Sequence, residues 1–521
     1  MARENNSDES PENPGLEKQD YSGTSASSLF KNGEGLSYSD FTILDTSFTD
    51  IDKEDISFEA NLGKGIVLKT PIIAAPMDTV TNSDLCIAIA LEGGIGVIHY
   101  NHKKENGERD FDEQIREIER VKRFENGFIE DPITVSPNHT IQEVLRIGME
   151  NKVGNSVIDT FPVTEDGSPH GKLVGLLRKQ DYSRSSHLSM TVSERMIPLS
   201  KLIHGKKPIT LKEANALLWE EHLLYLPIVN EKGNLASLVT RSDLDKNEQY
   251  PLATKDDKKR LRVLFAVDTR FDRTPEMLER AFAAGADGVV VDTSQGYTKY
   301  AEKMLMFIAE EYPNKLLMGG NISTGQAAMH LHDLHVVDCF RAGQGSGSIC
   351  TTAGTIGVSR ASASGIYSCA QQLADEGSKM RTIADGGIKE AGDIVKALAV
   401  GADAVMLGNI LAGTDESPGN IKINPRTGLP YKDYRGMGSA EANVGGIRGY
   451  GKMPQGVSGK VEYKGSIHKW VPLIRDAMIS GFHALNCRNI QELHLKLRSG
   501  KLRFEKRASG AFKESGINVE M

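Results

Sequence analysis

A glycine- and serine-rich stretch that ends at a cysteine is the part of the sequence best suited to chemistry. It reads Arg341-Ala342-Gly343-Gln344-Gly345-Ser346-Gly347-Ser348-Ile349-Cys350-Thr351-Thr352. Its backbone N–H groups and the Ser348 hydroxyl could hold a phosphate oxygen while the Cys350 thiol lies beside the bound molecule. A thiol in a polar, anion-binding loop is more prone to form the nucleophilic thiolate than one in an apolar helix. Cys86, inside an apolar run, is instead expected to be a packing residue.

The bulk composition excludes several classes of partner. The 521-residue chain has a formal net charge of -8, which argues against a general nucleic-acid binder with a basic surface. It contains no run of 18 apolar residues, so no membrane span is predicted. Its five cysteines are odd in number and form no C-x-x-C pair, which favours a reducing compartment. We therefore expect a cytoplasmic protein.

Changes in composition predict the organisation of the chain. Residues 1–30 are polar and acidic and are expected to form a disordered tail. Residues 31–128 and 249–521 are expected to form one catalytic domain in two parts. Residues 129–248 separate these parts and are expected to form an inserted regulatory domain.

The two flanking parts alternate between short apolar strands and helices. Strands are predicted over residues 71–78, 93–99, 288–292, 316–321, 381–387 and 402–408. Helices are predicted over 274–284, 300–312, 366–375 and 391–400. This alternation predicts a parallel sheet, and polar residues at successive strand ends favour a closed (β/α)₈ barrel with its active site at that edge. A doubly wound open sheet is the alternative, but no G-x-G-x-x-G motif in a suitable context supports it.

The insert contains a weak internal repeat. The repeated segments are Pro132-Ile133-Thr134 with Pro208-Ile209-Thr210, Phe161-Pro162-Val163 with Leu226-Pro227-Ile228, and Arg178-Lys179-Gln180-Asp181 with Arg241-Ser242-Asp243. Each copy is expected to form a strand, an amphipathic helix and a strand pair whose final Asp caps the next helix. The repeat resembles a tandem of CBS modules, a Bateman domain, which implies a regulatory unit that binds purine nucleotides such as ATP or GTP. The alternative is a pair of modules that pack together and bind nothing.

Further motifs accompany the cysteine loop along the chain. They are Gly35-Leu36-Ser37-Tyr38-Ser39-Asp40-Phe41, Pro76-Met77-Asp78-Thr79-Val80-Thr81, Ala384-Asp385-Gly386-Gly387-Ile388, Val405-Met406-Leu407-Gly408, Tyr434-Arg435-Gly436-Met437-Gly438-Ser439, Gln455-Gly456-Val457-Ser458-Gly459 and Phe504-Glu505-Lys506-Arg507. In this order, and with the repeat between them, they resemble the inosine monophosphate dehydrogenase family. The resemblance covers nearly the whole chain behind the acidic tail.

The resemblance implies an oxidoreductase that converts inosine 5'-monophosphate (IMP) to xanthosine 5'-monophosphate with NAD, in guanine nucleotide synthesis. Cys350 would add to C2 of the purine, hydride would pass from C2 to NAD, and water would hydrolyse the thioimidate. Covalent catalysis of this kind splits one difficult step into two. The implied catalytic residues are Cys350, Thr352, Arg448 and Tyr450.

The same resemblance assigns the binding residues. Asp385 would bind the ribose hydroxyls, which agrees with the ability of a carboxylate to accept from both. The remaining substrate residues implied are Gly387, Gly408, Asn409, Ser348 and Tyr434 at the phosphate, Met437, Gly438 and Gln455 at the base, and Arg341 and Gly436 beside them. The cofactor residues implied are Asp292, Ser294, Asn321, Gly343 and Gly345.

The resemblance also implies a potassium ion and an oligomer. Carbonyl groups of one subunit and of the C-terminal segment of its neighbour would share the ion. The residues implied are Gly345, Gly347 and Cys350, and from the neighbour Glu514, Ser515 and Gly516. Coordination by carbonyl groups alone suits a large monovalent cation better than Mg²⁺, which demands octahedral geometry. A shared site requires a homo-oligomer, and the family forms tetramers.

The segment between Ser439 and Gln455 departs from the dehydrogenase pattern. Dehydrogenases have a longer flap with an adjacent Arg-Tyr pair that activates water, whereas here Gly449 separates Arg448 from Tyr450. A short flap is typical of the related GMP reductases, which use NADPH, so a reductase is one alternative. Reductases need an acidic residue in place of Gln455, because a proton must reach the departing ammonia. A nucleotide-binding paralogue with impaired catalysis is the other alternative.

Overall fold

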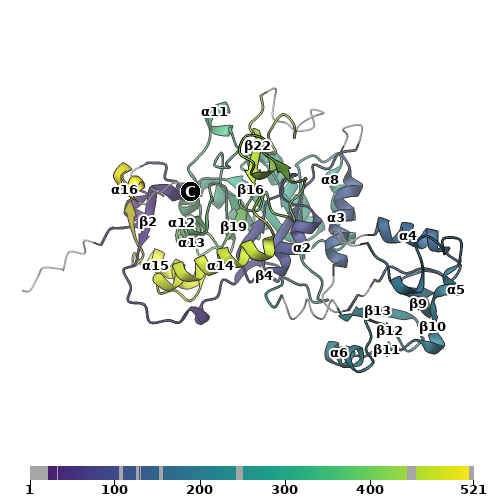
Figure 1. Ribbon diagram of the computed structural model, residues 1–521. Helices are drawn as coiled ribbons and strands as arrows, with labels where there is room; N and C mark the ends of the chain where they lie inside the picture. The colour runs from purple at the N-terminus through teal and green to yellow at the C-terminus, as the bar shows by residue number, and fades with distance from the viewer. Residues whose placement is uncertain are drawn as a thin grey trace, which may run out of the picture.

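The fold is described from a computed structural model that places residues 22–31, 33–104, 109–124, 128–129, 131–151, 157–241, 250–442 and 453–514. Eight parallel strands close into a barrel at its centre (Figure 1). In order around the barrel they are β14 (Val263–Val267), β15 (Gly288–Val291), β16 (Leu316–Ile322), β17 (Cys339–Ala342), β18 (Arg381–Asp385), β19 (Ala404–Leu407), β5 (Ile72–Ala74) and β6 (Ile95–Ile98). The predicted barrel is confirmed, and the open sheet is excluded.

The strands read as continuous apolar runs because the barrel interior covers one face and helices cover the other. Every residue of β14, β15 and β19 is buried. Six of the eight strands lie where the sequence predicts them. The exceptions are β14, which was not among the predicted strands, and β17, whose short run contains Arg341, a charged residue that interrupts the apolar pattern although all four positions are buried.

Helices surround the barrel. They are α2 (Ser83–Leu91), α3 (Phe111–Arg123), α8 (Thr274–Ala283), α9 (Lys299–Glu311), α10 (Gly325–Asp333), α12 (Ser362–Asp375), α13 (Ala391–Ala399) and α14 (Ile467–Ala484). Side-chain caps fix several of their starts: the Thr298 and Thr324 hydroxyls accept from the amides of Ala301 and Ala327, each at 3.3 Å. The four helices predicted from the sequence match α8, α9, α12 and α13, with differences of up to four residues at their starts.

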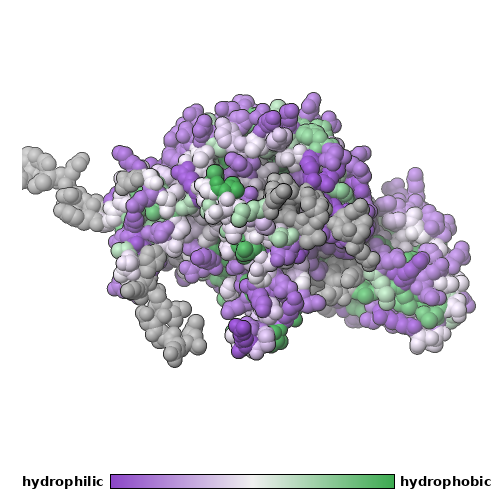
Figure 2. Space-filling model, turned by 90° about the horizontal axis from the view of Figure 1, so that it is seen from above, coloured by the Kyte–Doolittle hydropathy of each residue, from purple (hydrophilic) through white to green (hydrophobic). Residues whose placement is uncertain are grey.

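Further elements lie outside the eight strands and the helices that surround them. They are β3 (Ala60–Gly63), β4 (Ile66–Leu68), α11 (Thr352–Ile356), β20 (Lys422–Ile423), α15 (Ile490–Arg498) and α16 (Ser509–Glu514). Next to β20, the antiparallel strands β21 (Pro430–Arg435) and β22 (Ser458–Glu462) flank the flap, of which residues 443–452 lie outside the described part of the chain. Viewed from the side of α11 and β22, the surface is mostly hydrophilic with small apolar patches (Figure 2). No helix in the described ranges is long and apolar enough to cross a membrane.

The prediction of a disordered tail over residues 1–30 is wrong for its last part. Strand β1 (Thr24–Ser25) pairs with β23 (Arg503–Lys506), which also pairs with β2 (Phe41–Leu44). Helix α1 (Ala26–Leu29) follows, capped by the Ser25 hydroxyl. This segment is ordered because the C-terminal strand gives it hydrogen-bond partners and because Phe30 stacks on Tyr367 with ring centroids 4.5 Å apart. Residues 1–21 lie outside the described residues.

The insert forms two small modules beside the barrel (Figure 1). The first contains α4 (Ile141–Glu150), β8 (Phe161–Thr164), β9 (Leu173–Leu177) and β10 (Ile197–Pro198); the second contains β7 (Phe128–Ile129), β11 (Gly205–Lys206), α6 (Leu211–Glu220), β12 (Tyr225–Val229) and β13 (Leu235–Thr240). Their helices begin with the same capping box, Thr140 with Glu143 and Thr210 with Glu213. The repeat seen in the sequence is therefore a repeat of structure.

One detail predicted for the repeat is wrong. Asp181 does not cap a following helix, because its carboxylate is engaged by Arg178, whose backbone amide donates at 2.8 Å and whose guanidinium donates at 2.8 and 3.0 Å. The next helix, α5 (Val192–Arg195), begins instead with a capping box of Thr191 and Glu194. The second predicted cap, Asp243, lies outside the described residues.

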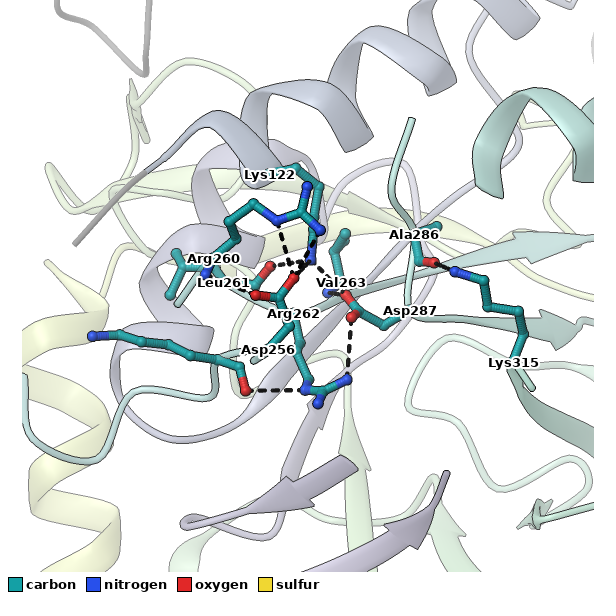
Figure 3. Close-up of polar contacts among 10 residues, drawn as sticks. Lys122, Asp256, Arg260, Leu261, Arg262, Val263, Ala286, Asp287 and Lys315 are labelled. Atoms are coloured by element: carbon teal, nitrogen blue, oxygen red, sulfur yellow. Dashed lines mark hydrogen bonds and ion pairs between the residues drawn. The ribbon is translucent and has the colours of Figure 1, made fainter. Parts of the chain in front are cut away.

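A buried ionic cluster fixes both ends of the insert to the barrel (Figure 3). Lys122, in the last turn of α3, donates to Asp256 and Asp287 at 3.0 Å each and to the carbonyl of Leu261 at 2.9 Å. The side chain of Lys122 is only 4% exposed. Helix α3 leads into the insert and Asp256 follows it. The cluster therefore holds the segment that enters the insert and the segment that leaves it together, beside the start of β15.

Candidate active site

One cavity at the carboxyl ends of the barrel strands gathers the residues predicted for the substrate and the cofactor. Its lining includes Cys350, Thr352, Arg341, Ser348, Asp385, Gly387, Gly408, Asn409, Tyr434, Gly436, Met437, Gly438, Gln455, Asp292, Ser294, Asn321, Gly343, Gly345 and Gly347. They come together because β15, β16, β17, β18 and β19 all end at this face. The position agrees with the prediction, and the role of each residue stays a prediction.

Cys350 differs from the other four cysteines in its surroundings. It is partly exposed and lines the cavity, whereas Cys86, Cys339, Cys369 and Cys487 are buried. Burial raises the pKa of Cys86 and Cys339 well above the ordinary value, and it raises the pKa of Cys369 to about 12. These buried thiols stay protonated, so Cys350 is the cysteine able to act as a nucleophile.

The backbone around Cys350 is held by the segment between the flap and β22. The amide of Val457 donates to the carbonyl of Ile349, and the amide of Thr351 donates to the carbonyl of Gln455, both at 3.0 Å. The amide of Cys350 in turn donates to the carbonyl of Gly347 at 3.0 Å. The thiol is therefore fixed relative to Gln455, although 105 positions separate the two residues in the sequence.

Thr352 connects the thiol to Gln455. Its hydroxyl oxygen lies 3.0 Å from the Cys350 sulfur and donates to the side-chain carbonyl of Gln455 at 3.2 Å. With its carbonyl occupied in this way, the Gln455 side chain has its NH₂ group left for a ligand in the cavity. An amide NH₂ can donate a hydrogen bond to a purine, but it cannot deliver a proton to a leaving group as a carboxylic acid can.

Arg341 lies between the two carboxylates of the site. It donates to Asp292 at 2.7 Å and to Asp385 at 3.0 Å, and its side chain is 8% exposed. The two carboxylates raise the pKa of Arg341 against the opposing effect of burial. Asn321 also donates to Asp385, at 2.7 Å, and to the carbonyl of Gly343 at 2.8 Å. One buried cation thus links the predicted ribose-binding residue to the predicted cofactor-binding residue.

Glycines leave space where the backbone forms the wall of the cavity. A Cβ on Gly408 would lie 3.2 Å from the Tyr434 hydroxyl, and one on Gly387, where φ is +80°, would lie 2.3 Å from the Ser362 hydroxyl. The Tyr434 and Ser348 hydroxyl oxygens are 3.5 Å apart. Burial raises the pKa of Tyr434, so its hydroxyl stays protonated and can donate. Exposed amides and two hydroxyls form a suitable environment for a phosphate group.

The sequence did not reveal one ion pair next to the cavity. Arg435 donates to both oxygens of Asp78, at 2.8 to 3.2 Å, and Asn101 donates to the same carboxylate at 2.6 Å. The backbone amide of Asp78 donates to the sulfur of Met437 at 3.4 Å. Asp78 and Arg435 both lie inside family motifs, so the motifs pointed to the segments, but only the fold pairs them.

Five predicted residues are not among the described residues that line this cavity. Arg448 and Tyr450 of the flap and Ser515 and Gly516 of the C-terminal segment lie outside the described residues. Glu514 ends α16 and does not belong to the cavity lining that the structure describes. In the placed parts of the chain, no group of three or more His, Cys, Asp or Glu side chains could hold a metal ion.

Known proteins are similar to this chain over nearly its whole length. A family profile described as IMP dehydrogenase / GMP reductase domain matches residues 35–518. The inosine-5'-monophosphate dehydrogenase of Schizosaccharomyces pombe is 37% identical, over 93% of this chain and 91% of its own length. The enzymes of the same name from Toxoplasma gondii and Caenorhabditis elegans are 35% and 34% identical, over 93% and 95% of this chain and 95% of their own lengths.

A solved structure is similar throughout as well. It is a variant of the GMP reductase from Trypanosoma brucei in complex with guanosine 5'-monophosphate (GMP). The TM-score is 0.83 at 30% sequence identity, and the match covers 94% of this chain and 98% of the other. The similarity therefore includes the inserted modules as well as the barrel.

Proposed function

The chain belongs to the IMP dehydrogenase and GMP reductase family, and from this premise we propose that it oxidises IMP to xanthosine 5'-monophosphate with NAD. The overall reaction consumes IMP, NAD⁺ and water and produces xanthosine 5'-monophosphate, NADH and a proton. It would serve guanine nucleotide synthesis. The relatives named as IMP dehydrogenases support this direction of the chemistry.

Cys350 would carry the covalent step. Its thiolate would form a bond to C2 of the hypoxanthine, and the hydride on C2 would leave to NAD, which supplies a two-electron acceptor when bound. Water would then add to C2 of the thioimidate, and the C2–S bond would break to release the product and the thiolate. The Thr352 hydroxyl, 3.0 Å from the sulfur and donating to Gln455, is placed to accept a hydrogen bond from the thiol, and the proton that the thiol loses on forming the thiolate would pass to solvent.

The observation that carries the proposal is the position of one partly exposed thiol among the predicted nucleotide residues. Asp385, fixed by Arg341 and Asn321, would accept from the ribose hydroxyls. The amides near Gly387, Gly408 and Asn409, with the Ser348 and Tyr434 hydroxyls, would bind the phosphate. Gln455, Met437 and Gly438 would meet the base, with Asp292 and Ser294 on the cofactor side.

A reductase is the second candidate, favoured by the short flap and by the similar GMP reductase structure. Reduction of GMP removes ammonia from C2, and the departing nitrogen needs an acid nearby. Gln455 cannot act as that acid, which supports the dehydrogenase. A binding protein with impaired catalysis is the third candidate, because the flap lacks an adjacent Arg-Tyr pair.

Initial-rate assays distinguish the three candidates. With IMP and NAD, the dehydrogenase produces the absorbance of NADH. If this reaction is absent while GMP oxidises NADPH, the protein is a reductase, and if nucleotides bind without either reaction, it is a binding protein. Cys350→Ala should abolish either activity, and turnover by that variant would disprove the role of the thiol.

Potassium binding is also proposed, on the Cys350 loop. The residues that would hold the ion are Gly345, Gly347 and Cys350, with Glu514, Ser515 and Gly516 from a neighbouring subunit. The Gly347 carbonyl already accepts from the amide of Cys350, but a carbonyl oxygen has a second lone pair for a weakly bound cation. Replacing K⁺ by Na⁺ or Li⁺ in the assay should lower the rate if the site exists.

The remaining proposals concern assembly, regulation and location. We propose a homo-oligomer, a tetramer in this family, which sedimentation analysis would test. The two inserted modules would form a CBS pair that binds ATP or GTP, and titration of each nucleotide against the assay would test this. A cytoplasmic location is consistent with the five free cysteines.

A further inference from the structure

A lysine lies behind the loop that we assign to the phosphate. Lys464 follows β22 and is not part of the described cavity lining. Its ammonium group donates to the carbonyl oxygens of Asn409, Ile410 and Ala412, the last two at 3.1 and 3.0 Å. An ammonium group has three N–H donors, and these three carbonyls use all of them. Lys464 therefore binds one side of a loop whose other side lines the cavity.

The loop is a short helical turn after β19. The amides of Leu411 and Ala412 donate to the carbonyl of Gly408 at 3.1 and 2.9 Å. In such a turn the first N–H groups and the last carbonyl groups point in opposite directions. Gly408 and Asn409, at the N–H end, line the cavity, whereas the carbonyl end meets Lys464. A cation at the carbonyl end stabilises this orientation of the peptide dipoles.

Lys464 is itself held in place. Its backbone amide donates to the carbonyl of Gly413 at 2.9 Å, and Gly465 accepts from the amide of Asp415 at 3.0 Å. Burial lowers the pKa of Lys464 to about 8, while the nearby Glu462 opposes this shift. The side chain is therefore still mostly protonated at neutral pH, despite its partial burial.

We propose that Lys464 is a positioning residue for the 5'-phosphate of the bound nucleotide. By holding the carbonyl side of the turn, it keeps the amides of Gly408 and Asn409 directed at the phosphate. The proposal depends on the proposed function only in requiring a nucleoside monophosphate as the ligand. IMP and GMP carry the same phosphate, so a failure of the dehydrogenase assignment, seen in the NADH assay, would leave this test valid.

The test compares a nucleotide with its nucleoside. Dissociation constants for IMP and for inosine are measured on the full-length protein from the protection of Cys350 against alkylation by iodoacetamide. In Lys464→Met, the dissociation constant for IMP should rise about tenfold or more, the scale of a lost charge-assisted contact. The constant for inosine, which lacks the phosphate, should stay within about twofold.

The chain offers a matched control. Lys432 is also a buried lysine that binds backbone carbonyls, those of Ser417 at 2.7 Å and Asp415 at 3.3 Å, in the segment beyond the turn. Lys432→Met should lower thermal stability without changing the ratio of the two dissociation constants. Mass spectrometry of the alkylated protein reports folding at the same time, because labelling of the buried Cys86 or Cys339 reveals a disrupted fold.

A second variant keeps the proposal falsifiable if Lys464→Met is disrupted. Lys464→Gln retains N–H donors without the charge and should shift the IMP constant in the same direction by a smaller factor. Equal weakening of IMP and inosine in the folded variants would mean a general disturbance of the site and would overturn the proposal. Unchanged IMP binding would overturn it too.

Discussion

Arg341 offers the most direct test of how the site is built. Its guanidinium is the cation between Asp292 and Asp385, and the two carboxylate side chains are 14% and 17% exposed. In Arg341→Met, both carboxylates remain in the site without this partner. Their mutual repulsion and poor solvation would favour protonation, and a protonated Asp385 would lose one of its acceptor sites for the ribose hydroxyls.

The size of the effect follows from the burial of the pair. Removing one partner of a buried ion pair costs about 3–5 kcal/mol. Asp385 keeps the hydrogen bond from Asn321, so the lower end of this range, about 3 kcal/mol, is the better expectation. If this loss falls on transition-state binding, kcat/KM drops by about 100-fold. Arg341→Lys should be intermediate, because an ammonium group is a point charge without the fork of a guanidinium.

The assay measures kcat/KM with IMP varied and with NAD varied, because Arg341 contacts both Asp385, on the proposed substrate side, and Asp292, on the proposed cofactor side. Arg381→Met is the control: this residue begins β18, the neighbouring strand, its side chain is 38% exposed, and its guanidinium lies 3.6 Å from the Asp403 carboxylate. Exposed pairs contribute about 0–1 kcal/mol, so the control should keep its activity. A kcat/KM for Arg341→Met within about threefold of the unmodified protein for both substrates would refute the argument.

Three further predictions concern the cavity wall and the stability of the fold. Gly343→Ala should lower kcat/KM by more than about tenfold, because its Cβ would lie 1.9 Å from the Asp385 carbonyl oxygen at a φ of +148°. Gly354→Ala, where the added Cβ would meet open space, should leave kcat/KM unchanged. Equal kcat/KM values for the two variants would contradict the prediction. Lys122→Met should destabilise the protein by about 2–4 kcal/mol, less than the full cost of a broken buried pair because Arg260 and Arg262 still contact the two carboxylates (Figure 3). Thermal denaturation measures the loss of stability, with Lys315→Met as the comparison, because the Lys315 amine binds one carbonyl, that of Ala286. Equal losses of stability in the two variants would count against a special role of the Lys122 cluster. Burial lowers the pKa of His102 to about 4, so its contribution to stability is complete above about pH 6.5 and is lost as the pH falls toward 4, in total about 3 kcal/mol. His102→Gln should therefore flatten the decline in melting temperature between pH 7 and 4, and an unchanged pH dependence would exclude that contribution.

Local patterns in the sequence were enough to determine the barrel and the segments that form its site. Buried parallel strands produce short, mainly apolar runs, here three to seven residues long, and the ends of α8 and α13 follow from helix-forming segments between them. The glycine-rich loop before Cys350 and the motifs around Asp385, Gly408 and Tyr434 are contiguous in sequence. Such features depend on neighbours within a few positions, so they can be read without the fold.

Contacts between distant segments were decided only by the tertiary structure. Arg341 pairs with carboxylates 49 and 44 positions away, and Lys464 binds carbonyls more than 50 positions away. The order of residues 24–29 depends on a strand near position 503, and β17 is buried although it contains an arginine. A charged residue is stable in these places because its partners arrive from other strands and loops, and no local periodicity records which partners those are.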